Sequence, residues 1–321
     1  MPGIGKPTER PGNEIVRGAV GIVGLVVVIL CARWFYQRHG ADFIAEAEIS
    51  WSFILIMSLL ILSFQFLAGI RMKLLTGMFG LKLAAYEWIG LAQMTTFFNY
   101  LPFKGGAVAG AFFLKGAHGF PYTRFLATMA ASSVLAVVTF SVVGSLGLCL
   151  LGFSSGVFSW PILAVYLLLV IVPLVFFLRI GRRVERTTNR HFILFLEGWS
   201  VIRTGGKRLV LLVMTDLAMV LIDATRITLC LGAVGLKPTF AVGLVIIPLS
   251  NILSVVSMVP GGLGVKEFIL GVLGGGLGIE FTRTIFAGTL DRMMLLLWVL
   301  FLGPLFIALI FLYRGFKTKN T

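Results

Sequence analysis

The stretch PGGLGVKE, residues 260–267, interrupts an apolar run that extends from about 239 to 277. Proline removes a backbone donor and glycine loosens the backbone, so a continuous membrane helix is not expected to contain this stretch. Irregular backbone is tolerated at membrane depth only where it is buried in protein or lines a wet cavity. A second break, LPFKGG at residues 101–106, lies in an equally apolar setting. Paired breaks of this kind predict a transporter-type binding site near the bilayer midplane.

The composition predicts a polytopic membrane protein. The 321 residues are 58% hydrophobic and 12% charged, with a mean hydropathy of +1.01, which is more apolar surface than a globular core can bury. The net charge of +14 comes from basic residues that flank the apolar runs. That placement favours attraction to anionic lipid headgroups over binding of nucleic acid.

The apolar runs predict an all-α fold with about six full spans plus two re-entrant helical hairpins. The runs long enough to cross about 30 Å lie at roughly 18–36, 50–69, 123–151, 160–178, 208–231 and 284–312. Regions 86–118 and 239–280 are apolar but broken near their centres. Each of these two regions predicts a pair of short helices.

Basic residues between the runs predict the orientation, because loops rich in Lys and Arg stay in the cytoplasm. The N-terminal tail, the loop with Arg71, Lys73 and Lys82, the strongly basic segment 179–207 and the C-terminal tail are therefore all placed inside. The hairpin at 86–118 then enters from the cytoplasm and the hairpin at 239–280 from the opposite side. We predict a multi-pass protein of the inner (cytoplasmic) membrane with both termini in the cytoplasm.

The same reasoning predicts one membrane domain built as an inverted repeat. After each break a Thr-Arg pair precedes a long span, at Thr123-Arg124 and at Thr282-Arg283. The predicted organisation is a cytoplasmic tail at 1–17, a single transmembrane domain at 18–314 and a second tail at 315–321. The repeat halves cover about 50–178 and 208–312 and are joined by the cytoplasmic loop 179–207.

Both breaks are candidate anion sites, because a helix that restarts after glycines presents free amides and the positive end of its dipole. The residues expected to surround a phosphate are Lys104, Gly105, Gly106, Gly261, Gly262, Gly264, Lys266 and Arg292. The alternative is that the glycines only permit close helix packing. Packing alone does not call for a lysine at both breaks.

Ionisable residues inside membrane spans are costly and usually serve a function or a partner. Glu267 lies in the first turn of a helix, where it caps the helix, pairs with Arg292 or accepts a coupling proton. Asp291 and Arg292 are adjacent and need partners elsewhere. Asp223 and Arg226 are three residues apart and either neutralise each other or serve function. Asp216 lies two turns before Asp223, which predicts a shared polar face.

No pattern in the sequence supports catalysis, and we predict neither enzymatic activity nor a cofactor. The motifs HExxH, GxSxG and the Walker P-loop do not occur. The three cysteines, Cys31, Cys149 and Cys230, are far apart in apolar runs, so neither a disulfide nor a metal site is expected.

Five motifs in order resemble the flippase-like family that includes the transmembrane part of lysylphosphatidylglycerol synthases. They are GIRMKLL at 69–75, NYLPFKGG at 99–106, FLEGW at 195–199, VPGGLGVKE at 259–267 and LDRMM at 290–294. The first repeat of such proteins often has an acidic-Arg pair where this chain has Ser132-Ser133, so a role for that pair rests here on Asp291 and Arg292. The synthase domain of bifunctional members is missing from this sequence, which favours a stand-alone translocator.

The resemblance implies movement of a lipid with a phosphate-bearing headgroup between leaflets. The expected partner is a polyprenyl-phosphate-linked sugar or an aminoacyl or glyco-phospholipid, and a homo-oligomer is possible. The phosphate is expected between the two breaks, near Lys104, Lys266 and Arg292, with alternating access around it. The alternative function is a channel or proton-coupled carrier for a small soluble anion.

Overall fold

The computed structural model describes residues 49–100, 105–180, 201, 205–256 and 260–319, and every regular element in these ranges is a helix. The elements in chain order are α3 (Trp51–Gly77), α4 (Ala85–Tyr100), α5 (Gly106–His118), α6 (Tyr122–Ser155), α7 (Trp160–Ile180), α9 (Lys207–Ala233), α10 (Phe240–Val256), the 3-10 turn η3 (Pro260–Gly262), α11 (Val265–Gly276) and α12 (Phe281–Lys319). The predicted all-α class is confirmed for this part of the chain. The predicted first span at 18–36, Lys104 and most of the segment 179–207 lie outside the described residues.

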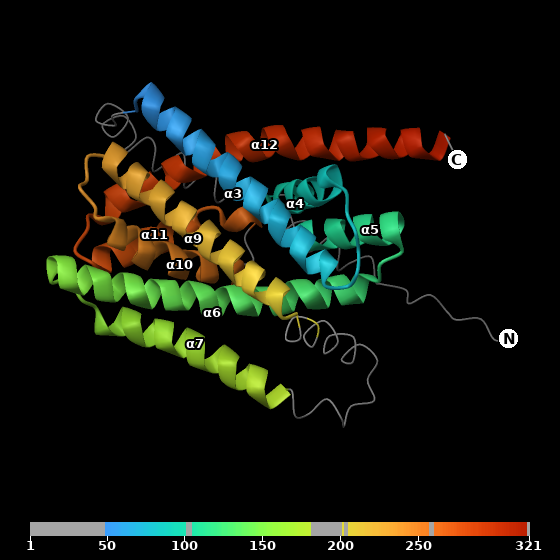
Figure 1. Ribbon diagram of the computed structural model, residues 1–321. Helices are drawn as coiled ribbons and strands as arrows, with labels where there is room; N and C mark the ends of the chain where they lie inside the picture. The colour runs from blue at the N-terminus through green and yellow to red at the C-terminus, as the bar shows by residue number, and fades with distance from the viewer. Residues whose placement is uncertain (1–48, 101–104, 181–200, 202–204, 257–259, 320–321) are drawn as a thin grey trace, which may run out of the picture.

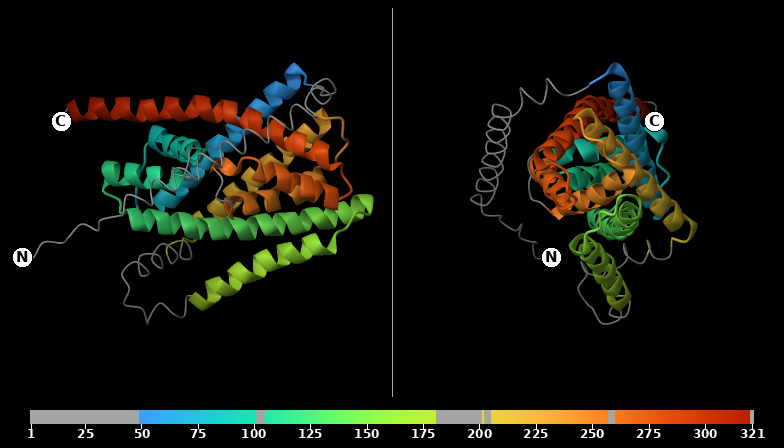
Figure 2. Two further views of the ribbon diagram at one scale, coloured as in Figure 1. Left: turned by 180° about the vertical axis from the view of Figure 1, so that it is seen from behind. Right: turned by 90° about the vertical axis from the view of Figure 1, so that its left-hand side faces the viewer.

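The helices form an elongated bundle with the short broken helices between long ones (Figure 1). Seen from behind, α12 runs along one side of the bundle and α6 along the opposite side, with α7 beyond it (Figure 2). Helix α10 packs against both α6 and α9, α4 packs against α12, and α3 packs against α9 and α4. Helix α7 covers the outside of α6. The broken helices therefore lie in the interior, where irregular backbone finds protein partners.

Local signals in the sequence set several helix ends. The side chain of Ser50 accepts a hydrogen bond of 3.1 Å from the Phe53 amide and caps the start of α3. Helix α5 ends where Gly119 adopts a φ of 65°, a left-handed conformation that glycine tolerates best. Pro121 lies two residues after Gly119 and directly precedes the first residue of α6. The α5–α6 connection is thus short and well defined by its residues.

Among the described residues, three helices are long and apolar enough to cross a membrane: α3, α6 and the Phe281–Ile310 part of α12. The chain is accordingly a helical membrane protein. Helix α9 has the length of a span but carries buried charges at Asp216, Asp223 and Arg226. The count of six spans stays a prediction.

The order of elements is the same in both halves of the chain. A long helix (α3 or α9) leads to a short pair (α4 and α5, or α10 and α11), and a second long helix (α6 or α12) follows. Thr123-Arg124 and Thr282-Arg283 fall in the first turns of α6 and α12. In Figure 1 the pair α4 and α5 occupies one end of the bundle and the pair α10 and α11 the other.

One prediction about the helix boundaries was wrong. Arg71 was assigned to a cytoplasmic loop, whereas α3 continues through it to Gly77. The Nε of Arg71 lies 2.7 Å from Oδ1 of Asp216 on α9, and its Nη2 donates to the Ser132 carbonyl on α6 at 3.2 Å. Because the guanidinium finds these partners inside the bundle, the charge does not end the helix.

Candidate functional site

The two breaks meet inside the bundle. Tyr100, the last residue of α4, lies against Gly261 of η3, and a Cβ added to Gly261 would collide with the tyrosine ring. Gly261 also has a φ of 60°, in the region that side chains other than glycine rarely adopt. Only glycine therefore allows this close approach between the two halves.

Arg292 of α12 joins the two breaks. Its Nε lies 2.8 Å from Oε1 of Glu267, which is in the first turn of α11. Its Nη1 donates to the Gly261 carbonyl at 2.7 Å and to the Tyr100 hydroxyl at 3.2 Å. The guanidinium carbon also lies 5.8 Å from the centre of the Tyr100 ring, within the range of a cation–π contact. One side chain thus holds η3, α11 and the end of α4.

Arg226 of α9 forms a second hub beside the first. Its Nη1 lies 2.9 Å from Oδ1 of Asp223, and its Nη2 lies 2.6 Å from Oδ1 of Asp291 on α12. Asn251 of α10 donates to the other oxygen of Asp223 at 3.0 Å. The Arg226 side chain is only 2% exposed. The contact between Asp223 and Arg226 that their spacing allows is present, and Asp291 enlarges the pair to a trio.

Lys266 is partly buried at the start of α11, next to Glu267 in the chain. The charges within its electrostatic reach are Asp223 and Asp291, together with Arg292 and Arg226. Among the described residues it forms neither an ion pair nor a hydrogen bond. Its ammonium group is therefore available to a ligand.

These residues form one group, which we call the charge cluster: Asp223, Arg226, Lys266, Glu267, Asp291 and Arg292. The cluster contains three cationic side chains and three carboxylates, so its net charge is zero when all six are ionised. Several of its buried polar atoms have no hydrogen-bond partner: Nε of Arg226, Nη2 of Arg292 and Oε2 of Glu267. Unpartnered buried polar atoms are rare in folded proteins and call for an explanation such as a ligand or water.

The first break is built differently from the second. The amide of Gly106 donates to Oδ1 of Asn99 at 3.2 Å, so this amide at the start of α5 is already occupied. A Cβ on Gly106 would collide with the Thr95 carbonyl and with Asn99. For Gly106 the structure supports close packing of α4 on α5. Gly105 precedes α5 with no side chain to cap it.

The glycines of the second break shape its backbone. Gly261, Gly262 and Gly264 all have positive φ, at 60°, 64° and 76°. Gly261 turns its carbonyl toward Arg292, so at this position the break presents an acceptor to the cluster. Gly264 precedes α11 and a Cβ there would meet open space.

Asp216 lies apart from the charge cluster, in its own ion pair with Arg71. The predicted polar face of α9 therefore consists of two separate groups in the described structure. Oδ2 of Asp216 is buried without a partner. The pair ties α9 to α3, and through the Ser132 carbonyl to α6.

Sequence reasoning missed Tyr100 and Asn251, which contact the charge cluster, and Arg71, which pairs with the predicted Asp216 apart from it. Arg71 and Tyr100 lie within two of the motifs that carry the family resemblance, GIRMKLL and NYLPFKGG. Neither residue was recognised there as a contact of a buried carboxylate or guanidinium. Asn251 had a weaker signal, as a lone amide in the apolar run before the second break.

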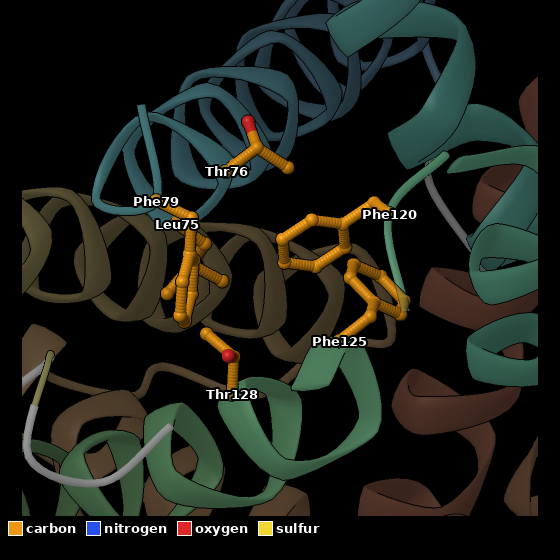
Figure 3. Close-up of a pocket in the computed structure, with 6 residues that line it drawn as sticks. All are labelled: Leu75, Thr76, Phe79, Phe120, Phe125 and Thr128. Atoms are coloured by element: carbon orange, nitrogen blue, oxygen red, sulfur yellow. The ribbon is translucent and has the colours of Figure 1, made fainter. Parts of the chain in front are cut away.

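A shallow hollow lies away from the cluster, between the end of α3, the α5–α6 turn and the start of α6 (Figure 3). Its walls are Leu75, Thr76, Phe79, Phe120, Phe125 and Thr128. The hydroxyl of Thr76 donates to Met72 at 2.8 Å and that of Thr128 to Arg124 at 2.7 Å. Because both hydroxyl protons are used within their own helices, the hollow offers apolar walls and little chemistry. Within the described ranges, no group of three His, Cys, Asp or Glu side chains is arranged to hold a metal ion.

The fold and the site define a helical membrane protein in which two broken helical segments meet at buried charges. Comparison with known families identifies the chain further. The model of the family described as the lysylphosphatidylglycerol synthase TM region matches residues 21–316. The chain therefore belongs to this family, and its function is related to membrane lipids. No curated protein and no solved structure matches the chain.

Proposed function

We propose that the chain is a lipid translocase that moves a lipid with a phosphate-bearing headgroup between leaflets. The observation that carries the proposal is the charge cluster, which lies where the two helical breaks meet and keeps buried donors without partners. A lipid tail can remain in the bilayer while only the headgroup enters the protein. Movement of the headgroup past the cluster requires a polar path, and the broken helices supply irregular backbone along that path.

The short helices support the proposed re-entrant hairpins. Helices α5 and α11 contain 13 and 12 residues, which corresponds to about 20 and 18 Å at 1.5 Å per residue. That is shorter than the roughly 30 Å apolar core of a bilayer. With six full spans and cytoplasmic termini, the two hairpins would enter from opposite sides of the inner membrane. The contact of Tyr100 with Gly261 is then a contact between the two hairpins.

Alternating access would come from rocking of the two halves around this contact. Such a movement has to break the hydrogen bond between Nη1 of Arg292 and the Tyr100 hydroxyl, which are 3.2 Å apart in this conformation. The headgroup phosphate would take the place of the Tyr100 hydroxyl and the Gly261 carbonyl on Arg292, with Lys266 beside it. Lys104 belongs to this proposal as the cation of the first break.

The proposal is tested with the full chain in proteoliposomes that contain an acyl-labelled phosphatidylglycerol or a labelled polyprenyl-phosphate-linked glucose. We expect Lys266→Ala to slow translocation by about tenfold or more, because charged contacts to phosphate are worth about 1.5–3 kcal/mol. The matched control is Lys115→Ala, which removes an exposed lysine that lies over the Tyr122 ring at 4.1 Å, away from the cluster.

Arg292→Ala is informative only if the protein still folds, since it leaves Glu267 buried and unpaired. The double variant Glu267→Gln/Arg292→Gln removes both charges and keeps two polar side chains of similar size. If this variant and Lys266→Ala both translocate as fast as the parent, the phosphate site is wrong. If no lipid moves and the protein instead transports radiolabelled inorganic phosphate, the function is that of a soluble-anion carrier.

A further inference from the structure

The charge cluster has more unused donors than unused acceptors. Nε of Arg226 and Nη2 of Arg292 are buried donors without partners, and the Lys266 ammonium group has no hydrogen bond among the described residues. On the acceptor side, the buried atom without a partner is Oε2 of Glu267. The oxygens of a phosphate diester only accept and would satisfy these donors, whereas an ammonium group would add further donors.

The carboxylates of the cluster are already matched by cations. Arg226 contacts both Asp223 and Asp291, and Glu267 pairs with Arg292. The trio of Asp223, Arg226 and Asp291 carries one excess negative charge, and the nearby Lys266 balances it. An ammonium group that entered the site would have to compete with a cation already in place.

The buried position of the cluster makes this discrimination strong. Arg226 is 2% exposed and Arg292 is 8% exposed. Electrostatic interactions are larger at such positions than at the surface, because little water screens them. A like charge brought against Lys266 is therefore unfavourable by more than a surface repulsion would be.

We infer that the cluster selects a lipid whose headgroup carries phosphate and no amine, and that Lys266 discriminates against aminoacylated, cationic phospholipids. This inference rests on the proposed translocase function and narrows its substrate. The shared chemistry, a lipid-borne phosphate without an ammonium group, occurs both in glycerophospholipids and in polyprenyl-phosphate-linked sugars.

The experiment compares three probes in proteoliposomes that contain the full chain: phosphatidylglycerol, lysylphosphatidylglycerol with the same acyl-chain fluorophore, and a fluorescent polyprenyl-phosphate-linked glucose. The rate of fluorophore reduction by dithionite added outside reports movement between leaflets. We expect at least one amine-free probe to move about tenfold or more faster than the lysyl lipid, the size of effect that one unfavourable charge contact produces. The two amine-free arms show which lipid source the site accepts.

Variants at position 266 connect the selectivity to this side chain. Lys266→Glu is expected to reduce or reverse the preference, and Lys266→Arg is expected to keep it. Lys266→Gln serves if the charge reversal prevents folding, and Lys115→Glu is the matched control that should leave the preference unchanged.

The possible results distinguish the inferred headgroup selectivity from the proposed translocase function. If the parent moves the lysyl lipid as fast as both other probes, the inference is overturned while the translocase function stands. An unchanged preference in folded Lys266→Glu or Lys266→Gln also overturns it. If none of the three probes moves faster than in protein-free vesicles, the proposed function itself fails.

Discussion

The two helical breaks occupy equivalent places in the two halves of the chain, yet they are built in opposite ways. At the first break the described backbone at Gly106 is closed in by its neighbours, because Gly106 donates to Asn99 and packs against Thr95. At the second break the backbone is held open by three glycines with positive φ. Its carbonyl at Gly261 is bound by a charged side chain, Arg292.

This difference shows that the repeated order of helices supplies a shared geometry, while the polar chemistry is unequally divided. In the described structure, all six members of the charge cluster come from α9, α11 and α12 in the second half. The first half contributes Tyr100, an aromatic hydroxyl. Because of this asymmetry, substitutions in the two halves are expected to change the stability of the protein by different amounts.

The largest expected effect comes from removing the centre of the second-half cluster. Arg226→Met leaves Asp223 and Asp291 buried without the cation that both contact. Breaking a buried ion pair in this way costs about 3–5 kcal/mol. We expect a correspondingly large loss of stability, measured by unfolding of the detergent-solubilised protein in an SDS titration.

Two further variants sharpen this test. Adding Asp223→Asn and Asp291→Asn to Arg226→Met removes the uncompensated charges and should restore much of the stability. Arg283→Met makes the same exchange near the start of α12, where the ion pair with Glu280 is partly exposed, so it should cost much less. An equal loss in Arg226→Met and Arg283→Met would contradict the assignment of Arg226 as the centre of the cluster.

Most of the fold could be predicted from the sequence because hydrophobic length and helix breakers act locally. The apolar runs located α3, α6, α7, α9 and α12, and the glycine segments located the breaks, with α5 starting at Gly106 and α11 at Val265. The error at Arg71 has a physical cause. A charge ends a membrane helix only if it finds no partner inside, and Asp216 lies 145 positions away in the sequence.

The candidate site was only partly predictable for the same reason. Asp223 and Arg226 are three residues apart, so helical geometry alone indicates their pairing. The contact of Arg226 with Asp291 depends on how α9 packs against α12, and no local pattern encodes that packing. Tyr100 has no charge to mark it, and it becomes part of the site only because Gly261 lets the two breaks touch.

A smaller effect is expected from adding one methyl group to each break. In Gly106→Ala the new Cβ meets the Thr95 carbonyl, a backbone atom that cannot move aside, whereas in Gly261→Ala it meets the Tyr100 ring. Overpacking of this kind costs about 1–3 kcal/mol, and we expect Gly106→Ala to be the more damaging of the two in the same SDS titration.

A second substitution, Tyr100→Ala, distinguishes Gly261→Ala from Gly106→Ala. Tyr100→Ala removes the ring that the new methyl group would meet, so it should recover part of the loss in Gly261→Ala and none in Gly106→Ala. The remaining loss at Gly261 reflects its φ of 60°. Gly275→Ala is the control, since a Cβ there meets no atom within 4 Å. Rescue of both variants, or of neither, would show that the breaks do not differ as described.

The smallest expected effect isolates the hydrogen bond between the halves. Tyr100→Phe removes the hydroxyl that accepts from Arg292 at 3.2 Å and keeps the ring against Gly261 and below the guanidinium. An ordinary hydrogen bond contributes about 0.5–1.5 kcal/mol. Although the donor is charged, this bond is long and Arg292 keeps two other partners, so the SDS titration should show a loss in that range. Tyr122→Phe, on the first turn of α6, removes a hydroxyl far from the cluster and should change little. Arg292 keeps Glu267 and the Gly261 carbonyl as partners in this variant. A loss of stability in Tyr100→Phe as large as in Arg226→Met would therefore mean that the first half stabilises the cluster as much as Arg226 does, which would contradict the unequal division between the halves.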